Sequence, residues 1–343
     1  MAEKKRKIAS RQHNRFVEER KDHKRTRIAP ANLLAKAGTL SGSFLTQARR
    51  IERVLREALG EPFYSKAGFI LYNGDCCEVL ERLRASDFTF NLTVTSPPYN
   101  IGKEYESARP LDRYVEWCSK WMTLIHATTT PTGSFWLNLG YLEVDGSGLC
   151  VPIPYLIWNK SPFYLLQEVV WHYGAGVSAR KRLSPRNEKW LFYTKERNDY
   201  TFNLDDIRDP NVKYPNQKKN GKFRCNPLGK NPSDVWSFPK VTTGRKRSSR
   251  ERTGHPAQFP LPVVERVVLA SSNRGELVLD PFAGSGSTGI AATALGRIFV
   301  GVERDTDYCK MAASRHREFL DAVEQEHAQQ SLFDAPAAAK SDR

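Results

Sequence analysis

The sequence predicts an α/β fold in which one mainly parallel sheet carries helices on both faces. Residues 91–95 form a short apolar and β-branched run, which is typical of a buried strand. Residues 277–280 form a second such run, and a glycine-rich turn leads from it into a helical pattern over residues 290–295. Strands that alternate with helices build doubly wound sheets. The 343 residues suffice for one large domain with a smaller insertion, or for two domains.

The first 60 residues are strongly basic. They hold 16 Lys or Arg against 6 Asp or Glu and so carry most of the net charge of +15. Cationic side chains that replace counterions on phosphates favour a polyanionic partner. Residues 1–32 contain few apolar side chains, and we expect them to be disordered in isolation, either as a solvated tail or as an arm that orders on DNA. From Phe44 to Leu59 apolar residues recur at helical spacing.

Residues 69–75 are typical of a strand that ends in an acidic turn at Asp75, with a helix following from Cys76. An Asp at this place is a good helix N-cap, and its carboxylate can also accept from a ligand. Apolar and aromatic residues from Tyr114 to Ile125 predict a buried helix. Further strands are expected at residues 133–140, 166–173 and 189–195, the last two as a hairpin.

No run of about 18 apolar residues occurs, and the N-terminus has no apolar core of a signal peptide. We therefore expect a cytoplasmic protein that does not enter a membrane. The six cysteines lack a paired Cys-x-x-Cys spacing, so the sequence indicates neither a metal site nor a disulfide framework.

The stretch from Ser96 to Tyr99 reads Ser-Pro-Pro-Tyr and follows the strand at residues 91–95 directly. The prolines favour extended geometry and carry no N–H, so neighbouring carbonyls can accept bonds from other groups. A hydroxyl, an exposed carbonyl and an aromatic face suit a planar ligand with an amino group, such as a nucleobase. The alternative is a rigid turn with a packed tyrosine.

Residues 284–289 read Gly-Ser-Gly-Ser-Thr-Gly, and Glu303 follows Gly284 by 19 residues at the end of another apolar run. On spacing alone this pattern also fits a nicotinamide dinucleotide site. However, Asp280 places a carboxylate at the strand tip where a pyrophosphate would lie. An anion there suits an amino group better.

Together, Ser96-Pro-Pro-Tyr and Asp280-Pro-Phe-Ala-Gly-Ser-Gly-Ser-Thr resemble the motifs of S-adenosylmethionine-dependent DNA amino-methyltransferases. The order of the two motifs is similar to that of the family's β class. The resemblance spans about residues 69–320 and implies a Rossmann-like methyltransferase fold with a seven-stranded sheet. It implies that the catalytic residues are Ser96, Pro97, Pro98 and Tyr99. It implies that S-adenosylmethionine is bound by Asp75, Asp280, Phe282, Ala283, Gly284, Ser285, Gly286, Ser287, Thr288 and Glu303.

The same resemblance divides the chain into five segments. The expected organisation is a basic arm and helix (1–60), a catalytic half (61–196), a target-recognition region (197–253), a cofactor-binding half (254–325) and a flexible tail (326–343). Lys and Arg lie among Asn, Pro and Gly in the target-recognition region, which suits contact with double-stranded DNA.

The acceptor is expected to be an exocyclic amino group of a flipped base. Methylation of carbon 5 of cytosine would need a Pro-Cys nucleophile, which the chain lacks. Within the family, Ser before Pro-Pro-Tyr is commoner in enzymes that make N4-methylcytosine, and Asp in those that make N6-methyladenine. We therefore expect cytosine N4, with adenine N6 as the alternative. A non-catalytic nucleic-acid-binding module and an RNA substrate are the other readings.

The tail contains a short segment that resembles the peptide by which bacterial proteins dock to the sliding clamp. The residues concerned are Gln329, Ser331, Leu332 and Phe333. The alternative is an ordinary frayed terminus. The family resemblance also implies a cognate restriction endonuclease in the same system.

Overall fold

The computed structural model of the chain describes residues 33, 36–37, 41–102, 106, 108–176, 178–241 and 251–334, with side chains up to residue 329. The expected basic arm at residues 1–32 lies outside the described residues. The side chains expected to dock to a sliding clamp at residues 331–333 lie outside them as well.

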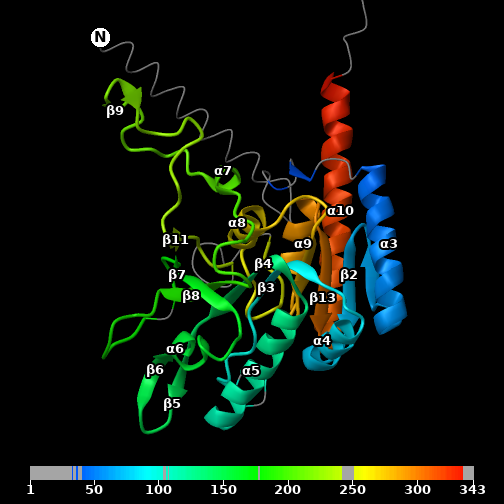
Figure 1. Cartoon of the computed structure of the whole chain (residues 1–343), viewed down its shortest axis with the longest axis vertical. Helices are drawn as coiled ribbons and strands as arrows, with labels where there is room; N and C mark the ends of the chain where they lie inside the picture. Colours follow the sequence, from blue (N-terminus) through cyan, green and yellow to red (C-terminus); the bar gives the residue numbers. More distant parts are fainter. Residues whose placement is uncertain are drawn as a thin grey trace, which may run out of the picture.

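A nine-stranded sheet forms the centre of the protein (Figure 1). Its strands, in spatial order, are β1 (Tyr64–Lys66), β2 (Phe69–Asn73), β13 (Ile298–Glu303), β12 (Leu277–Asp280), β3 (Phe90–Thr95), β4 (Thr129–Leu139), β8 (Asn187–Thr194), β7 (Tyr164–His172) and β11 (Val235–Ser237). The five strands from β2 to β4 are parallel. Strand β8 runs antiparallel to both of its neighbours, and β11 pairs with β7 in parallel.

The mainly parallel α/β architecture predicted from the sequence is confirmed, but the expected number of seven strands was too small. Seven strands, from β2 to β7 in the spatial order, form the body of the sheet. Strands β1 and β11 add a three-residue strand at each edge. Such short edge strands carry too few residues for an alternating pattern to be visible in the sequence.

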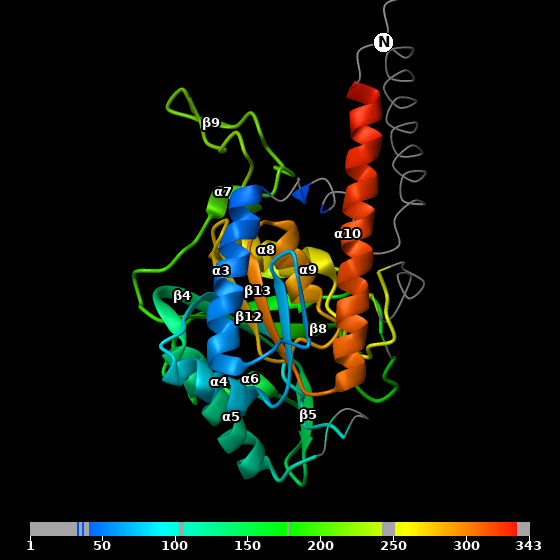
Figure 2. The ribbon, with the colours of Figure 1, turned by 90° about the vertical axis from the view of Figure 1, so that its right-hand side faces the viewer.

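The helices form two layers, one on each face of the sheet. The helices are α3 (Gly42–Leu59), α4 (Cys76–Ala85), α5 (Leu111–Ala127), α6 (Ile153–Ile157), α7 (Leu204–Ile207), α8 (Leu261–Ser271), α9 (Ser287–Ala294) and α10 (Thr306–Asp334). Helices α3 to α6 bury their apolar residues in one core cluster, and α8 to α10 bury theirs in a second. Figure 2 shows α3 and α10 on opposite sides of the sheet.

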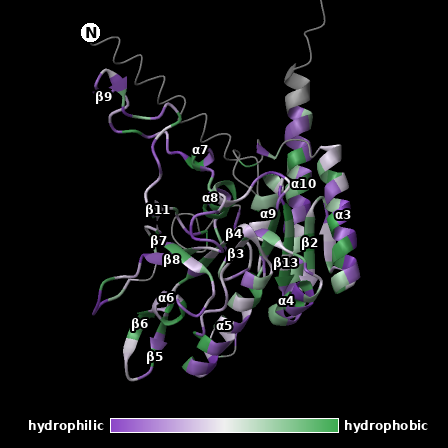
Figure 3. Cartoon of the chain, viewed as in Figure 1, coloured by the Kyte–Doolittle hydropathy of each residue, from purple (hydrophilic) through white to green (hydrophobic). Residues whose placement is uncertain are grey.

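Alternation along the strands explains why both layers form. Ile70 and Tyr72 of β2 belong to the cluster under α3 to α6, whereas Phe69 and Leu71 belong to the cluster under α8 to α10. Successive side chains of a strand point to opposite faces, so an uninterrupted apolar strand must be covered on both. Figure 3 shows hydrophobic residues on the central strands and hydrophilic ones on the outer faces of α3 and α10.

Two small hairpins project from the body. One consists of β5 (Tyr141–Val144) and β6 (Gly148–Pro152), and the other of β9 (Lys218–Lys219) and β10 (Lys222–Phe223). The second lies within residues 197–253 and extends away from the sheet in both ribbon views (Figures 1 and 2). No helix in the described part of the chain is long and apolar enough to cross a membrane.

Candidate active site

The two sequence motifs meet because their strands are neighbours. Strands β12 and β3 pair in parallel, with Val278 opposite Leu92, so both end at the same edge of the sheet. There the hydroxyl of Thr95 donates a hydrogen bond of 2.6 Å to Oδ1 of Asp280. Ligands of open α/β sheets bind at this carboxyl edge. The 185 residues that separate the motifs in the sequence are therefore no obstacle to a common site.

A cavity of about 530 Å³ lies at this edge. Its lining includes every residue proposed for the site from the sequence except Gly286: Asp75, Ser96, Pro97, Pro98, Tyr99, Asp280, Phe282, Ala283, Gly284, Ser285, Ser287, Thr288 and Glu303. Gly286 is buried at the start of α9 with φ of 75°, and an added Cβ would lie 3.0 Å from Cβ of Ala312. Its place is therefore in the packing of the loop against α10.

Asp280 is a buried carboxylate, only 3% exposed, that lines the cavity. Its Oδ1 accepts from Thr95 and from the backbone N–H of Phe282 (3.1 Å), and its Oδ2 accepts from the hydroxyl of Thr288 (2.7 Å). Burial raises its pKa to about 6, although the three hydrogen bonds oppose the shift. The site thus holds an anion that a cationic group of a ligand would stabilise.

The glycine-rich turn between β12 and α9 follows the cavity wall closely. Gly284 has φ of +50°, in the left-handed region, and a Cβ there would lie 2.9 Å from Nε2 of His255. Its N–H donates to Oε2 of Glu303 (2.8 Å). Gly289, on α9, allows the helix to approach the sheet, since a Cβ would lie 2.2 Å from the ring of Phe69. Steric crowding therefore explains why the first and third positions of the pattern are glycines.

Glu303 ends β13 opposite the glycine turn. Besides Gly284, its carboxylate accepts from the backbone N–H of Asp305 through Oε1 (2.8 Å). Burial raises its pKa, and these backbone donors oppose the shift. Two carboxylate oxygens at the rim of the cavity can accept a pair of ligand hydroxyls.

The Arg315 side chain hydrogen-bonds to the glycine-rich turn, a role that the sequence analysis did not predict. The side chain comes from α10 and is 5% exposed. Its Nη1 donates to the carbonyl of Ser285 (3.1 Å) and to the hydroxyl of Ser287 (2.7 Å), while Glu251 lies 3.8 Å from Nη2. Burial lowers its pKa to about 10, so it remains a cation. In the sequence, nothing distinguishes Arg315 from the other charged residues of this helix.

The hydroxyl groups of Ser96 and Tyr99 form the other side of the cavity. Ser96 Oγ donates to Tyr99 Oη (3.1 Å), and Tyr99 Oη donates to Oδ1 of Asn138 (2.9 Å) or to Oε2 of Glu188 (3.4 Å). The Tyr99 ring packs on Gly140, where a Cβ would lie 2.7 Å from Cε2. Because the single proton of the Ser96 hydroxyl is donated to Tyr99, its oxygen lone pairs remain for a ligand donor.

The turn after Tyr99 is fixed by side chains that the sequence did not identify. Asn100 adopts φ of 62°, and the carboxylate of Glu106 accepts from the N–H groups of Asn100 and Ile101 (both 2.8 Å). The hydroxyl of Tyr114 donates to the carbonyl of Pro98 (3.0 Å). Other lining residues not proposed from the sequence are Gly74, Cys76, Arg109, Trp117, Ala257, Phe259, Pro281, Arg304, Asp305 and Tyr308.

His255 also lines the cavity. Its Nδ1 accepts from the N–H of Ala257 (3.2 Å), and its ring makes an edge contact with Tyr308. Burial, together with the positive charge of Arg315, lowers its pKa to about 4. At neutral pH the imidazole is uncharged and packs over the glycine turn.

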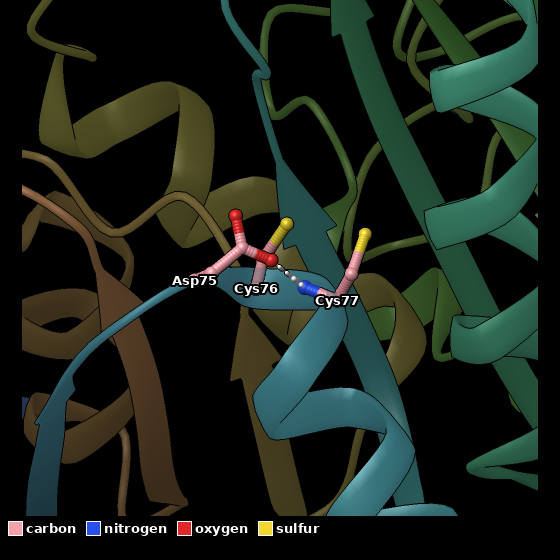
Figure 4. A group of neighbouring side chains, drawn as sticks. All are labelled: Asp75, Cys76 and Cys77. Atoms are coloured by element: carbon pink, nitrogen blue, oxygen red, sulfur yellow. Dashed lines mark hydrogen bonds between the residues drawn. The ribbon is translucent and has the colours of Figure 1, made fainter.

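Asp75 is the N-cap of α4, which confirms one of the two roles expected for it from the sequence. Its Oδ1 accepts from the N–H of Cys77 (2.9 Å; Figure 4). Asp75 also lines the cavity. The ligand atoms of Asp75, Cys76 and Cys77 lie within 4.8 Å of one another. Since the Asp75 carboxylate is engaged in capping and both thiols are buried, we assign this group no metal.

The cavity lining is rich in carboxylates, namely those of Asp75, Glu106, Asp280, Glu303 and Asp305. Arg109 and Arg304 are its arginines. S-adenosylmethionine carries a sulfonium and an ammonium group, both cationic, and ribose hydroxyls that donate hydrogen bonds. The acceptor-rich, anionic lining of the cavity fits such a ligand better than a pyrophosphate.

The family model described as DNA methylase, of the N6/N4 methyltransferases, matches residues 90–314. The type II methyltransferase M.ScaI of Streptomyces caespitosus is 57% identical over 261 residues, covering 76% of this chain and 85% of M.ScaI. DNA adenine methyltransferase YhdJ of Escherichia coli K12 is 32% identical over 259 residues, covering 71% of this chain and 81% of YhdJ.

Among solved structures, the cytosine-N4-specific PvuII DNA methyltransferase superposes with a TM-score of 0.56 at 18% identity. The match covers 77% of this chain and 94% of that chain, and it confirms the methyltransferase fold expected from the sequence. The chain therefore belongs to the N6/N4 DNA methylases, enzymes that use S-adenosylmethionine to methylate an amino group of a DNA base.

Proposed function

We propose that the protein methylates the N4 amino group of cytosine in a specific DNA sequence, as the modification enzyme of a restriction-modification system. The observation that carries the proposal is the Ser96 hydroxyl, which donates to Tyr99 and presents oxygen lone pairs beside the cavity that Asp280 also lines. M.ScaI, to which the chain is 57% identical, is a type II methyltransferase, which supports the biological setting.

In this proposal the cofactor lies along the glycine turn. The Asp280 carboxylate receives the ammonium of its methionine part, and Glu303 receives the ribose hydroxyls. Asp75 lies at the adenine end, and Phe282, which packs edge-on against Trp117 and Trp121, forms an apolar wall. The bound cofactor supplies an electrophilic methyl group.

The residues Ser96 to Tyr99 would orient the acceptor. An exocyclic amino nitrogen is a poor nucleophile because its lone pair is delocalised into the ring. Hydrogen bonds from its two N–H groups to Ser96 Oγ and to the Pro97 carbonyl would localise that pair on the nitrogen, while Tyr99 stacks on the ring. Transfer of this kind depends on orientation and on electrostatic stabilisation rather than on a covalent intermediate.

The choice of cytosine rests on Ser96, because Ser before Pro-Pro-Tyr resembles the N4-cytosine enzymes. Adenine N6 is the second candidate, and the 32% identity with the adenine methyltransferase YhdJ favours it. Both bases present an amino group next to a ring nitrogen, so the reaction chemistry is the same for either.

We assign target recognition to residues 197–253 and the two halves of the catalytic domain to residues 61–196 and 254–325. The exposed Lys218, Lys219 and Lys222 of the β9–β10 hairpin can reach phosphates, and the exposed ring of Phe223 lies beneath Lys218 Nζ (4.7 Å). A cognate endonuclease remains part of the proposal, as does a sliding-clamp contact through residues 329–333.

The test is to incubate the protein with unmethylated genomic DNA and labelled S-adenosylmethionine, then digest to nucleosides and separate them. Labelled N4-methylcytosine is expected, and a Ser96→Ala variant should lose at least about 100-fold in rate. Labelled N6-methyladenine would overturn the choice of base. No transfer to DNA, or transfer to RNA alone, would overturn the function.

A further inference from the structure

A chain of hydrogen bonds leads from the acceptor site to a carboxylate on the neighbouring hairpin. It starts at Ser96 Oγ, passes through Tyr99 Oη (3.1 Å) and reaches Oε2 of Glu188 (3.4 Å), at the start of β8. Glu188 is only partly buried, whereas residues 190–194 of the same strand are buried. It lies outside both sequence motifs.

Glu188 is held in place by a partly buried lysine. Lys240 Nζ contacts its Oε1 at 2.5 Å, and the two side chains are 22% and 13% exposed respectively. The same ammonium lies 3.9 Å from the ring centroid of Tyr173. Burial alone would lower the pKa of Lys240, but the neighbouring Glu188 and Tyr173 more than offset it and the pKa is raised. Lys240 is therefore protonated, and its ion pair with Glu188 holds the carboxylate in position near Tyr99.

The direction of the hydrogen bonds is set by Asn138. Its Nδ2 donates to the carbonyl of Lys189 (3.2 Å), so its Oδ1 faces Tyr99 and accepts a hydrogen bond from the phenol hydroxyl (2.9 Å). An amide oxygen accepts a hydrogen bond but is too weakly basic to take up the proton itself, whereas a carboxylate can take it up. Rotation about the phenol C–O bond moves the Tyr99 proton from Asn138 to Glu188 without any movement of heavy atoms.

We propose that Glu188 is the terminal proton acceptor of methyl transfer, acting through Tyr99 and Ser96; the inference rests on the function proposed above. When the amino nitrogen bonds to the methyl carbon, the carbon–sulfur bond breaks and the nitrogen becomes positively charged. One N–H bond of that nitrogen then breaks, and its proton passes to Ser96 Oγ. The Ser96 proton passes to Tyr99 Oη, and the Tyr99 proton to Glu188 Oε2. The products are a neutral methylamino base, two restored hydroxyls and a neutral carboxyl group.

The relay would remove the positive charge that methyl transfer leaves on the amino nitrogen in the cavity. A charged amino group next to buried apolar walls is costly, and the carboxylates of the cofactor half are engaged by Thr95, Thr288 and the glycine turn. Glu188 accepts the charge at the partly exposed side of the site and can return the proton to solvent. Glu188 touches neither base nor cofactor, so it is a positioning residue and not a catalytic one.

The test compares Glu188→Gln with the wild type in single-turnover transfer to unmethylated genomic DNA, with the cofactor saturating. The variant keeps the shape of the side chain and is expected to lower the rate about 100-fold. Affinities for cofactor and DNA and the melting temperature should stay near wild-type values.

Glu168→Gln is the matched control. Glu168 pairs with Lys189 (3.2 Å) on the same β7–β8 hairpin, so the control removes an equal charge from an ion pair whose side chains make none of the hydrogen bonds of the relay. It should transfer at the wild-type rate. A wild-type rate for Glu188→Gln would overturn the relay. So would a loss of rate that is accompanied by a weaker DNA affinity or a lower melting temperature sufficient to account for it.

Tyr99→Phe provides a second arm should Glu188→Gln fold poorly, since it keeps the ring against Gly140. It should also lower the rate about 100-fold. The double variant should be no slower than the slower single one, because both substitutions break one chain. Additive losses would overturn the relay. If the wild type transfers no methyl group to DNA, the proposed function fails; if only these comparisons fail, the function stands and the relay does not.

Discussion

Asp280 makes a quantitative prediction about stability and ligand binding together. Its pKa is raised from 3.8 to about 6, because the carboxylate is buried beside the cavity. At 1.36 kcal/mol per pKa unit, the ionised form costs the ligand-free protein about 3 kcal/mol at neutral pH. Asp280→Asn removes this charge while keeping an oxygen for Thr95 and for the N–H of Phe282. The variant should therefore be more stable than the wild type at pH 7 to 8, by about 1 to 3 kcal/mol.

The pH dependence follows from the direction of the shift. Because the folded-state pKa lies above the unfolded value, the folded protein binds more protons between pH 4 and 6, and the wild type loses stability as pH rises through about 6. The advantage of Asp280→Asn should thus be largest above pH 7 and vanish near pH 4. Urea denaturation from pH 4 to 8 measures it, with the exposed Asp145→Asn in the β5–β6 turn as control.

Ligand binding should change in the opposite sense. A carboxylate paired with an ammonium group is worth about 1.5 to 3 kcal/mol, so Asp280→Asn should weaken S-adenosylmethionine binding by about 10- to 150-fold in calorimetry. In the wild type the affinity should fall as pH drops below about 6. Two results would refute the reasoning about the buried charge. One is an Asp280→Asn protein that is less stable than the wild type at pH 8, and the other is a difference in free energy of unfolding between the two proteins that is the same at pH 4 and at pH 8.

Three further substitutions separate steric, cationic and hydrogen-bonding contributions. Gly284→Ala should lower the affinity for the cofactor at least about 10-fold in calorimetry, because its Cβ would lie 2.9 Å from Nε2 of His255. Gly146→Ala is the control, with φ of +66° and open space around it, and it should lower only the free energy of unfolding, by about 1 kcal/mol of backbone strain. Arg315→Met should cost about 3 to 5 kcal/mol in urea denaturation, and a loss below 1 kcal/mol would contradict its supporting role. Thr95→Val should cost about 1.5 to 3 kcal/mol by removing a donor to Asp280. Thr93→Val, two residues earlier, should be neutral or stabilising, since its buried hydroxyl finds no partner among the described residues; equal losses at both threonines would argue against a specific bond.

The contiguous motifs could be predicted from the sequence because their chemistry is local. Two prolines after a strand and glycines before a helix restrict the backbone wherever they occur, so Ser96 and Asp280 could be placed at strand ends without a structure. That all the proposed site residues but Gly286 line one cavity follows from the parallel pairing of β3 with β12, of β12 with β13 and of β13 with β2. Gly286 differs because spacing alone cannot tell a glycine that faces a ligand from one that faces a helix.

The rest of the site depends on tertiary packing. Arg315 lies 30 residues from Ser285, and Lys240 lies 52 residues from Glu188, so no local pattern joins either pair. Each sits in a segment where a basic residue is ordinary, in a long polar helix for Arg315 and in a lysine-rich insertion for Lys240. Only burial distinguishes them, and burial is a property of the fold.

Asp280 also shows why such a site resists prediction by stability rules. A buried carboxylate without a cationic partner is unfavourable for folding, and an apolar residue there would suit the ligand-free protein better. Thr95 on the catalytic strand and Thr288 on α9 both donate to it, so the charge is shared between the two motifs and retained at a cost to stability. A cation that binds beside Asp280 would recover that free energy, so the cost of Asp280 in the ligand-free protein would become a source of affinity in the complex. If the proposed function is right, cofactor binding should depend on a residue that the preference for an apolar core disfavours.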